Sequence, residues 1–465
     1  MVLIQSISGI RGTIGGRPGE GLSPVDVMTF AGAYGMWLKN RNPDTQLKVV
    51  IGRDARLSGP VITHIVTATL QAMGIDVIDL GLSTTPTVEL GVKHHTSHGG
   101  IVITASHNPK NWNALKLLNE KGEFMTKEEG EAMQVFAEPL AFSFVPSDML
   151  GRYITDEKML ERHIDMIRNL PLVDTEAIAA ANFHIVVDGI NSSGGVAVPA
   201  LLRALGVQKI TGLHCEPTGL FQHNPEPLPE HLHSLSAEVE STSAHLGIAV
   251  DPDVDRLAMV CENGDMFGEE YTLVAVADYV LSKTPGNTVS NLSSSQALAE
   301  VTKKHGGLHF YSPVGEAHVV EAMKKHHAVI GGEGNGGVIY PALHYGRDAL
   351  AGIALFLSAL ALRGISASRL KNTLPQFHIS KNKIELPEGV DIGSIIGELA
   401  RKYREQPQET IDGLKIWFDN QWVHLRASNT EPIIRMYTES DSMVKAEKLA
   451  KLIQSDISGV IRTMR

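Results

Sequence analysis

The sequence predicts an α/β protein. Short apolar runs rich in β-branched residues alternate with capped helical segments through most of the chain, which is the pattern of βαβ units. Several of these runs end directly in turns of small polar residues, where open α/β sheets hold their ligands. The 44 glycines are spread among such turns rather than gathered in one linker, which suits a protein that binds its ligand on loops.

The composition is that of an ordinary globular protein with several domains. At 465 residues, the usual domain size predicts three or four units. The chain is 43% hydrophobic and 20% charged, and no apolar run reaches the ~18 residues of a membrane span. The net charge of −11 argues against non-specific nucleic-acid binding. Cys215 and Cys261 form neither a disulfide framework nor a zinc pattern, and no signal peptide is visible, so we expect a cytoplasmic location.

The N-terminal part of the chain carries the clearest alternation. Ser23-Pro-Val-Asp26 provides a capping serine, a proline at the first helical position and an acid at the third, so we expect a helix to about Lys39. The pattern then predicts strands at 47–51, 76–80 and 101–103, with a helix to about residue 73 between the first two. Residues 8–16 are rich in glycine and contain Arg11. Such a segment either approaches an anion or forms a surface turn.

A serine hydroxyl is predicted at the end of the third of these strands. The apolar run stops in Thr104-Ala-Ser106-His-Asn-Pro109, the serine turn, whose small residues and proline force a bend. A serine in a turn is most often a cap, but a buried strand here points it toward a ligand site. Lys116 is close enough in sequence to return to the same pocket. Two arginines after the 47–51 strand are either surface charges or serve this turn: Arg53 and Arg56.

A carboxylate-rich loop follows another predicted strand, 246–250. This strand runs into Asp251-Pro-Asp253-Val-Asp255-Arg256, the aspartate loop. Three carboxylates two residues apart repel one another unless a cation lies between them, and oxygen ligands alone favour Mg²⁺ over Zn²⁺. An EF-hand is excluded because the sixth position is not glycine. The alternative is a solvated acidic turn.

Two further polar loops complete the set of candidate site residues. A strand over 184–188 and a third βα unit at about 266–361 are predicted, and within that unit an apolar run enters Gly331–Gly337, the glycine loop. Its Glu333 and Asn335 offer an acceptor and an amide for sugar hydroxyls.

The C-terminal part has a different pattern, which predicts a small antiparallel sheet at 413–418, 422–426 and 433–437, followed by a helix from about Ser442. Between two of these strands lies Arg426-Ala-Ser-Asn-Thr-Glu-Pro432, the arginine bend, and Arg435 follows it. Arginines, hydroxyls, an amide and backbone N–H groups suit a phosphate. The alternative is an ordinary hairpin with charges at its edge.

Breaks in the pattern divide the chain. The irregular stretch at 142–155 marks the first boundary, and we expect domains at 1–148, 149–264, 265–370 and 371–465. Residues 219–229 are predicted to be irregular because their prolines prevent a helix. No internal repeat is visible, and nearly all of the 20 histidines are interpreted as ordinary structural residues.

Four of these segments together resemble the α-D-phosphohexomutase family, the phosphoglucomutases, phosphomannomutases and phosphoglucosamine mutases. They are the serine turn, the aspartate loop, residues 332–336 of the glycine loop, and the arginine bend. Their order and spacing match that family over essentially the whole chain. The resemblance implies an α/β protein with three similar mixed α/β domains and a C-terminal α+β domain around a central cleft.

The resemblance also implies roles for the candidate residues. Ser106 corresponds to the phosphoserine, and the ligands of Mg²⁺ are its phosphate with Asp251, Asp253 and Asp255. Arg256 lies beside them, and the sugar is contacted by Glu333 and Asn335. The phosphate that is not reacting is bound by Arg426, Ser428, Asn429, Thr430 and Arg435. Family positions near the serine are matched by Arg11, Arg53, His107 and Lys116.

The activity that the resemblance implies is transfer of a phosphoryl group between the 6- and 1-positions of a hexose phosphate. A hexose 1,6-bisphosphate is then both intermediate and activator. Many relatives end the glycine loop with a histidine where this chain has Gly337, so proton transfer is expected from Lys116 first and His107 second. The form of the loop with Asn335 resembles a branch assigned to phosphoglucosamine or to both glucose and mannose phosphates. We expect phosphoglucosamine mutase activity, with dual phosphoglucomutase/phosphomannomutase activity as the alternative.

Two other functional classes compete with a mutase. A phosphatase acting through phosphoserine generally needs histidine or aspartate ligands for a second metal ion, and none is suitably spaced here. A silent sugar-phosphate binding protein would lack Ser106 or an aspartate ligand, and all are present. The expected partner is a small hexose phosphate, without nucleic acid or membrane, and the expected state is a monomer or homodimer.

Overall fold

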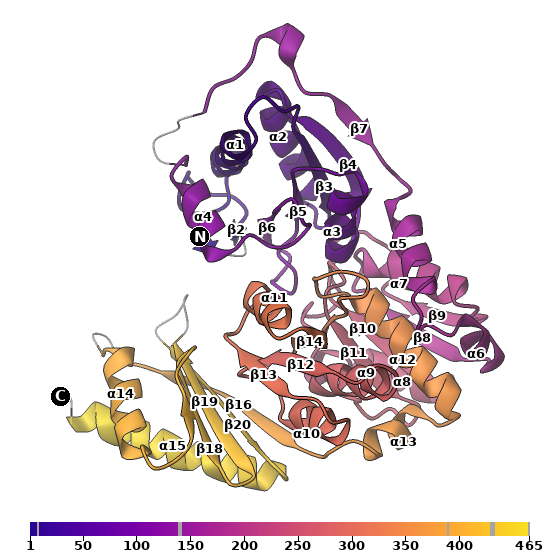
Figure 1. The fold of residues 1–465 in the computed structure, drawn as a ribbon, viewed down its shortest axis with the longest axis vertical. Helices are drawn as coiled ribbons and strands as arrows, with labels where there is room; N and C mark the ends of the chain where they lie inside the picture. The colour runs from indigo at the N-terminus through magenta and orange to yellow at the C-terminus, as the bar shows by residue number, and fades with distance from the viewer. Residues whose placement is uncertain (7–8, 138–141, 388–389, 428–432, 464–465) are drawn as a thin grey trace.

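The structure, a computed structural model of the 465-residue chain, describes all residues except 7–8, 138–141, 388–389, 428–432 and 464–465. It consists of four units in chain order, each built on its own β-sheet. Figure 1 shows them as successive colour zones, from the indigo N-terminal unit to the yellow helix α15 at the C-terminus.

The first unit has a seven-stranded sheet in the order β1-β2-β6-β5-β3-β4-β7. Its strands are β1 (Leu3–Ser6), β2 (Gly9–Thr13), β3 (Lys48–Arg53), β4 (Asp76–Leu82), β5 (Gly99–Ile103), β6 (Trp112–Leu118) and β7 (Tyr153–Thr155). Its helices are α1 (Pro24–Arg41), α2 (Gly59–Ala72), α3 (Thr85–His94) and α4 (Lys127–Gln134). Because β7 pairs with β4, the chain beyond residue 148 still adds a strand to this sheet.

The second and third units each have a four-stranded sheet. The second contains β8 (His184–Asp188), β9 (Lys209–Leu213), β10 (Leu246–Val250) and β11 (Leu257–Cys261), with α5 (Met159–Arg168), α6 (Thr175–Ala180), α7 (Gly194–Ala204) and α8 (His233–Ser241). The third contains β12 (Asn287–Asn291), β13 (His309–Ser312), β14 (Ala328–Glu333) and β15 (Gly337–Ile339), with α9 (Glu269–Lys283), α10 (Ala297–Lys304), α11 (Glu316–Lys325), α12 (Ala349–Arg363) and α13 (Ala367–Asn372).

The first three units share one topology. Each sheet contains three parallel strands followed by one antiparallel strand, in the orders β4-β3-β5-β6, β9-β8-β10-β11 and β13-β12-β14-β15. In each unit a short loop joins the last parallel strand to the antiparallel one. These three equivalent loops are the serine turn, the aspartate loop and the glycine loop. The repeat lies in strand order and not in residue identity, which is why the sequence shows none.

Near the N-terminus the sequence predicted the start of α1 but not strand β2. The start of α1 is confirmed, because Ser23 and Asp26 form the reciprocal capping box that the sequence predicts. The glycine-rich segment is not a loop throughout, since β2 occupies residues 9–13. A Cβ atom at Gly9 would lie 2.1 Å from the carbonyl oxygen of Leu115 on β6. Glycine is therefore needed there because two strands approach closely, and that approach is a tertiary contact.

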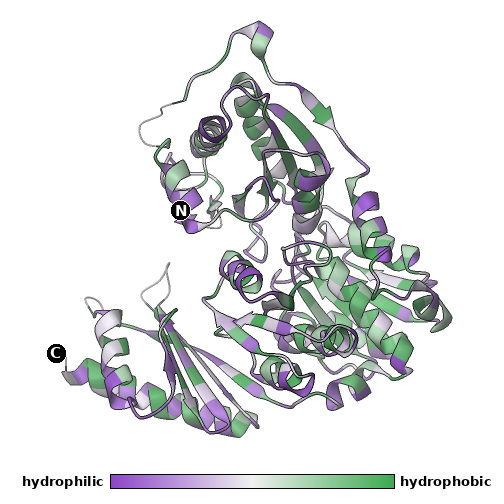
Figure 2. Cartoon of the chain, in the orientation of Figure 1, coloured by the Kyte–Doolittle hydropathy of each residue, from purple (hydrophilic) through white to green (hydrophobic). Residues whose placement is uncertain are grey.

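The second and third units are joined by one apolar core. Side chains from both units form a single buried cluster, in which α9 and α12 pack against each other. Every residue of α12 from Ala349 to Leu360 is buried, and the helix is strongly hydrophobic in Figure 2, as expected for a helix enclosed on all sides. The first and C-terminal units have separate cores.

The C-terminal unit is an antiparallel sheet covered by two helices. The strands, in the order β16-β20-β19-β18-β17, are β16 (His378–Glu385), β17 (Gln408–Glu409), β18 (Leu414–Phe418), β19 (Gln421–Ala427) and β20 (Ile433–Ser440). The helices are α14 (Ile392–Lys402) and α15 (Met443–Thr463). The three predicted strands and the last helix are confirmed, whereas β16, β17 and α14 were not predicted. Contacts run to the third unit, where the Lys415 ammonium donates to the Leu292 carbonyl at 2.7 Å.

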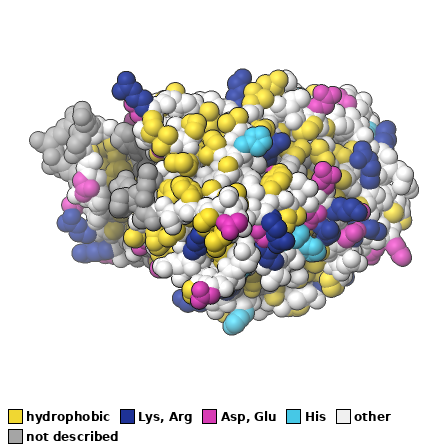
Figure 3. Space-filling view, turned by 90° about the horizontal axis from the view of Figure 1, so that it is seen from above, with side chains coloured by type: hydrophobic (Ala, Val, Ile, Leu, Met, Phe, Trp, Pro, Cys, Tyr) yellow, Lys and Arg dark blue, Asp and Glu magenta, His cyan; other side chains and the backbone are white. Residues whose placement is uncertain are grey.

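On the face seen in Figure 3, acidic and basic side chains are interspersed among apolar and uncharged ones. Among the described residues, no helix is both long enough and apolar enough to cross a membrane. The four-domain α/β architecture that the sequence predicts is confirmed.

Candidate active site

The serine turn and the aspartate loop meet at a hydrogen bond. The Ser106 hydroxyl donates to Oδ2 of Asp251 at 2.6 Å, although 145 residues separate them in the chain. Ser106 is 6% exposed and has a φ of 50°, in the left-handed region that a non-glycine residue adopts only when its surroundings impose it. The structure therefore fixes this hydroxyl in one place.

Arg56 binds the backbone of the serine turn. Its buried guanidinium donates to the carbonyl oxygens of the serine turn and the start of β6: Ser106 at 2.5 Å, Asn108 at 2.6 Å, Pro109 at 2.7 Å and Trp112 at 3.0 Å. Asp54 pairs with it at 3.0 Å, and Thr104 donates to the same carboxylate. Arg56 is thus a structural residue, which decides between the interpretations that the sequence left open.

The aspartate loop gathers three fully buried carboxylates. One oxygen of each lies within 4.8 Å of the others. Oδ1 of Asp251 accepts the backbone N–H groups of Asp255 and Arg256, both at 3.1 Å. Oδ1 of Asp253 and Oδ1 of Asp255 have no hydrogen-bond partner among the described residues. Burial and the neighbouring carboxylates hold the pKa of Asp251 well above its usual range. Unpartnered, mutually repelling carboxylate oxygens fit a hard divalent cation such as Mg²⁺.

Two cations lie close to these carboxylates. The ammonium of Lys116, on β6, lies 2.6 Å from Oδ2 of Asp253 and 3.2 Å from Oδ2 of Asp255. Burial alone would lower the pKa of Lys116, but these carboxylates outweigh burial and raise it. Arg256, the last residue of the loop, pairs with Glu226 at 3.0 Å.

His107 and Arg11 lie at the same place. Nδ1 of His107 is 3.4 Å from the Ser106 hydroxyl, and burial together with Arg256 holds the pKa of His107 well below its usual range. The pKa of Arg11, on β2, is lowered by burial and by the same arginine. Basic side chains from the first two units are therefore concentrated beside the serine, as an anionic ligand would require.

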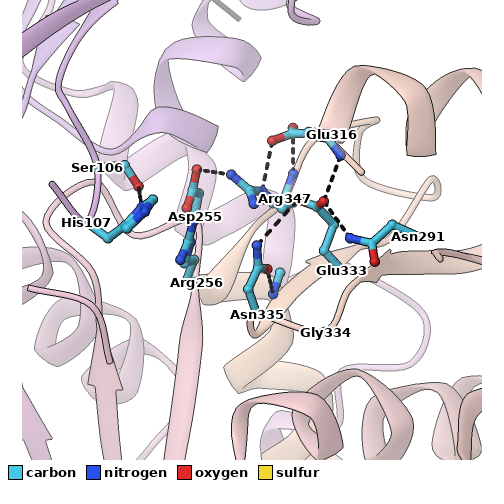
Figure 4. Close-up of polar contacts among 12 residues, drawn as sticks. Ser106, His107, Asp255, Arg256, Asn291, Glu316, Glu333, Gly334, Asn335 and Arg347 are labelled. Atoms are coloured by element: carbon cyan, nitrogen blue, oxygen red, sulfur yellow. Dashed lines mark hydrogen bonds and ion pairs between the residues drawn. The ribbon is translucent and has the colours of Figure 1, made fainter. Parts of the chain in front are cut away.

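Arg347 joins the aspartate loop to the glycine loop, and sequence reasoning missed it. Its guanidinium pairs with three carboxylates, as Figure 4 shows: Asp255 at 2.7 Å, Glu333 at 2.7 Å and Glu316 at 2.9 Å. The only local signal was an arginine just before the cap of an apolar helix, α12. Its partners come from separate units, so only the fold shows its role.

Glu333 and Asn335 are held in place within the glycine loop. Oε1 of Glu333 accepts from the Asn291 amide at 2.7 Å and from a backbone N–H, while Oε2 accepts from Arg347 (Figure 4). Burial opposes ionisation of Glu333, but Arg347 outweighs it and lowers the pKa. Oδ1 of Asn335 accepts from the Gly337 backbone at 3.1 Å. A Cβ atom at Gly334 would lie 1.9 Å from Oε2 of Glu270, so any other residue there would require that carboxylate to move.

Of the five residues predicted to bind the non-reacting phosphate, the structure describes Arg426 and Arg435. Ser428, Asn429 and Thr430 lie outside the described residues. Arg426 on β19 and Arg435 on β20 are directly opposite each other, and Lys383 on β16 is opposite Arg435. Asp412 pairs with Arg426 at 2.8 Å. Like charges opposite one another destabilise a sheet, so a bound anion would stabilise this row of three cations. Lys383 was not among the residues that the sequence indicated.

The fold is that of a phosphohexomutase. Models of the phosphoglucomutase/phosphomannomutase α/β/α domains I, II and III match residues 4–138, 161–264 and 268–377, and the model of the C-terminal domain matches residues 383–454. The chain belongs to the phosphoglucomutase/phosphomannomutase family and is an enzyme of the phosphohexomutase class.

Relatives match over nearly their full length. A phosphoglucomutase/phosphomannomutase of Thermococcus kodakarensis is 35% identical, over 95% of this chain and 96% of that protein. A probable phosphoglucosamine mutase of Methanopyrus kandleri is 33% identical, over 95% of each. The crystal structure of a family protein from Burkholderia thailandensis superposes with a TM-score of 0.84 at 25% identity, covering 99% of this chain and 98% of that one.

Proposed function

We propose that the enzyme is a hexose-phosphate mutase that works through a phosphoserine at Ser106 and a hexose 1,6-bisphosphate intermediate, with glucosamine phosphate as its substrate. The observation that carries this proposal is the hydrogen bond between Ser106 and Asp251, beside two buried oxygens, Oδ1 of Asp253 and Oδ1 of Asp255, that have no hydrogen-bond partner among the described residues. A nucleophile at this position can carry a phosphoryl group beside a cation site.

Asp251, Asp253 and Asp255 would hold Mg²⁺ together with the phosphate on Ser106. When bound, the ion supplies positive charge that offsets the negative charge of the phosphoryl oxygens. A phosphoserine carries about −1.5 to −2 charges near neutral pH. Arg11 and Arg256 beside it reduce its repulsion of an incoming sugar phosphate.

Phosphoryl transfer then proceeds in two steps, first from Ser106 to the sugar and then from the bisphosphate back to Ser106. The bond between phosphorus and the Ser106 oxygen breaks as a bond to a free sugar hydroxyl forms. The hydroxyl proton passes to a base, for which His107 is the candidate because its pKa is held low. The serine oxygen receives a proton, for which the Lys116 ammonium is the candidate donor. The bisphosphate reorients, and its other phosphate returns to Ser106. Arg426 and Arg435, with Ser428, Asn429 and Thr430, would bind the phosphate that is not reacting, and Glu333 and Asn335 would bind the sugar.

The substrate is proposed from the glycine loop and the relatives. Several relatives, including that of Methanopyrus kandleri, are named probable phosphoglucosamine mutases. Dual activity on glucose and mannose phosphates is the second candidate, because the Thermococcus kodakarensis relative at 35% identity carries that name. A cytoplasmic location and a monomeric or homodimeric state remain predictions from the sequence.

Intact mass and coupled assays test the proposal. We expect a phosphate adduct on Ser106, and turnover with Mg²⁺ fastest on glucosamine 1-phosphate among the 1-phosphates of glucosamine, glucose and mannose. Ser106→Ala should abolish turnover while retaining sugar-phosphate binding. Full activity of that variant would remove Ser106 from the mechanism. Release of inorganic phosphate faster than isomerisation would indicate a phosphatase instead.

A further inference from the structure

A second group of metal-type ligands lies in the second domain, outside the site described above. Asp188 ends β8, His214 directly follows β9, and His223 lies in the irregular stretch beyond it (Figure 1). Oδ2 of Asp188 is 3.1 Å from Nδ1 of His214 and 3.0 Å from Nε2 of His223. One ligand atom from each residue lies within 4.8 Å of the other two. Asp188 is 26 residues from His214 and 35 residues from His223, so the sequence gave no indication of this cluster. The pairing of β8 with β9 brings Asp188 and His214 together.

The contact of His223 with Asn224 directs its second ring nitrogen at the carboxylate. Nδ1 of His223 is 2.8 Å from the backbone carbonyl oxygen of Asn224. A carbonyl oxygen only accepts, so Nδ1 carries the proton and Nε2 of the neutral ring is an acceptor. That acceptor faces Oδ2 of Asp188, a second acceptor. Something positive must lie between them, either a further proton or a cation.

This arrangement is also the one that prepares histidine for a metal ion. Ligating histidines commonly donate their other ring N–H to a carbonyl or carboxylate, which fixes the tautomer and orients the ring. Tetrahedral bonds of ~2.0–2.1 Å place ligand atoms roughly 3.4 Å apart, so separations of 3.0 and 3.1 Å need only small shifts. The side chains of His214 and His223 are 24% and 17% exposed, so an ion can enter.

We propose that Asp188, His214 and His223 form a second metal site, which binds one divalent cation of the zinc class. Two imidazole nitrogens and one carboxylate oxygen favour zinc and its neighbours over Mg²⁺, which prefers oxygen ligands. Water completes the coordination. This site is chemically distinct from the all-oxygen aspartate loop, and it is independent of the proposed substrate.

The location gives the metal a structural role. The loop that carries His223 also places the Phe221 ring over the Arg56 guanidinium, at 5.0 Å, and pairs Glu226 with Arg256 at 3.0 Å. A metal ion that joins this loop to the ends of β8 and β9 therefore restrains two arginines. Arg56 contacts the serine turn, and Arg256 is the last residue of the aspartate loop. The ion stabilises the loop by closing it onto the sheet.

Zinc titration of the full-length protein in excess Mg²⁺ tests the site, because Mg²⁺ occupies the aspartate loop. We expect one zinc ion per chain, an X-ray absorption signature of imidazole ligands, and a higher melting temperature with zinc. His214→Gln and His223→Gln should each weaken zinc binding by at least about tenfold. His305→Gln is the matched control, since His305 also pairs with a buried aspartate, Asp278, but without a second histidine. Asp253→Asn should leave zinc binding unchanged.

Two results would overturn the proposal. Absence of stoichiometric zinc binding by the unmodified protein would mean that a proton alone lies between His223 and Asp188. Zinc that binds equally well to both histidine variants, or that is lost in Asp253→Asn, would belong to another site. The titration of the unmodified protein keeps the test decisive even if a variant fails to fold.

Discussion

At the scale of single residues, the site depends on side chains that satisfy several partners at once. Arg347 binds three carboxylates through the three nitrogens of one planar guanidinium, whereas all the donors of an ammonium lie on a single nitrogen. Asp255, Glu316 and Glu333 come from two different units, so the orientation of the aspartate loop relative to the glycine loop depends on this one residue.

Arg347→Lys should therefore retain the positive charge but lose the simultaneous contacts with three carboxylates. We expect kcat to fall by about 10- to 100-fold, the usual cost of removing a residue that orients a metal ligand. Mutase kinetics and thermal unfolding measure this. Arg363→Lys is the control, because Arg363 also pairs with a buried aspartate, Asp278, but away from the site. Unchanged kcat in Arg347→Lys would show that turnover does not depend on the guanidinium's contacts with the three carboxylates.

Asp278 gives a pH-dependent contribution to stability. It pairs with His305, Arg363 and Lys304, and although burial opposes ionisation, these partners lower its pKa to about 2. A carboxylate with a folded pKa below its unfolded value of 3.8 stabilises the protein above about pH 4, and this contribution is lost as pH falls through about 2.

Asp278→Asn should reduce the free energy of unfolding by about 2 kcal/mol at neutral pH, because each pKa unit corresponds to about 1.4 kcal/mol. The difference from the unmodified protein should shrink as pH falls from about 4 toward 2. Urea unfolding across this range measures it. Asp165→Asn, which removes an exposed partner of Arg168, should change little. A difference that does not depend on pH would exclude this explanation.

At the scale of elements, three equivalent loops carry the chemistry. Each connects the last parallel strand of a sheet to an antiparallel neighbour, and the buried strand fixes where the loop begins. Strand and turn patterns are local, so the sequence predicted β8 and β10 at their observed bounds and placed Ser106 at a strand end. It missed β16, whose residues lie mostly at or near the surface and carry few apolar side chains.

The serine turn should loosen when Arg56 is changed to Lys. Lysine cannot reach the four carbonyl oxygens that the guanidinium binds, and each buried carbonyl left without a partner costs about 1–3 kcal/mol. We expect faster hydrogen exchange of backbone amides in residues 104–112 and a lower kcat.

Arg152→Lys is the matched control for this change. Arg152 pairs with Asp76 in the same domain, but its side chain is 72% exposed. If exchange in the serine turn were the same in Arg56→Lys as in the unmodified protein, another residue would be holding the turn.

At the scale of the whole molecule, the first three domains bring their loops to one place, while the C-terminal sheet contributes a row of cations. Arg426, Arg435 and Lys383 lie on three neighbouring strands, directly opposite one another. A phosphate bound there would connect this domain to a ligand at the serine turn.

Lys383→Gln should raise KM for the sugar phosphate by about twofold to fivefold, which is the effect of removing one exposed ion pair of up to ~1 kcal/mol. Phosphorylation of Ser106 should be unaffected, and the effect should shrink as salt concentration rises. Steady-state kinetics at several ionic strengths measure this. Lys402→Gln removes the same charge from α14, where Lys402 pairs with Asp456, and should leave KM unchanged. Equal KM values for both variants would contradict an anion site on β16.

The sequence by itself determined the elements and the residue types of the chemistry. Turn residues after apolar runs indicated Ser106, the aspartate loop and the glycine loop, and the capping box at Ser23 fixed the start of α1, because these signals lie within a few residues of one another. Only the tertiary structure decided the roles of Arg56 and Arg347 and the meeting of Asp188 with two histidines. Arg347 and Asp255 are 92 residues apart, and their contact follows from strand order and domain packing, which no local pattern encodes.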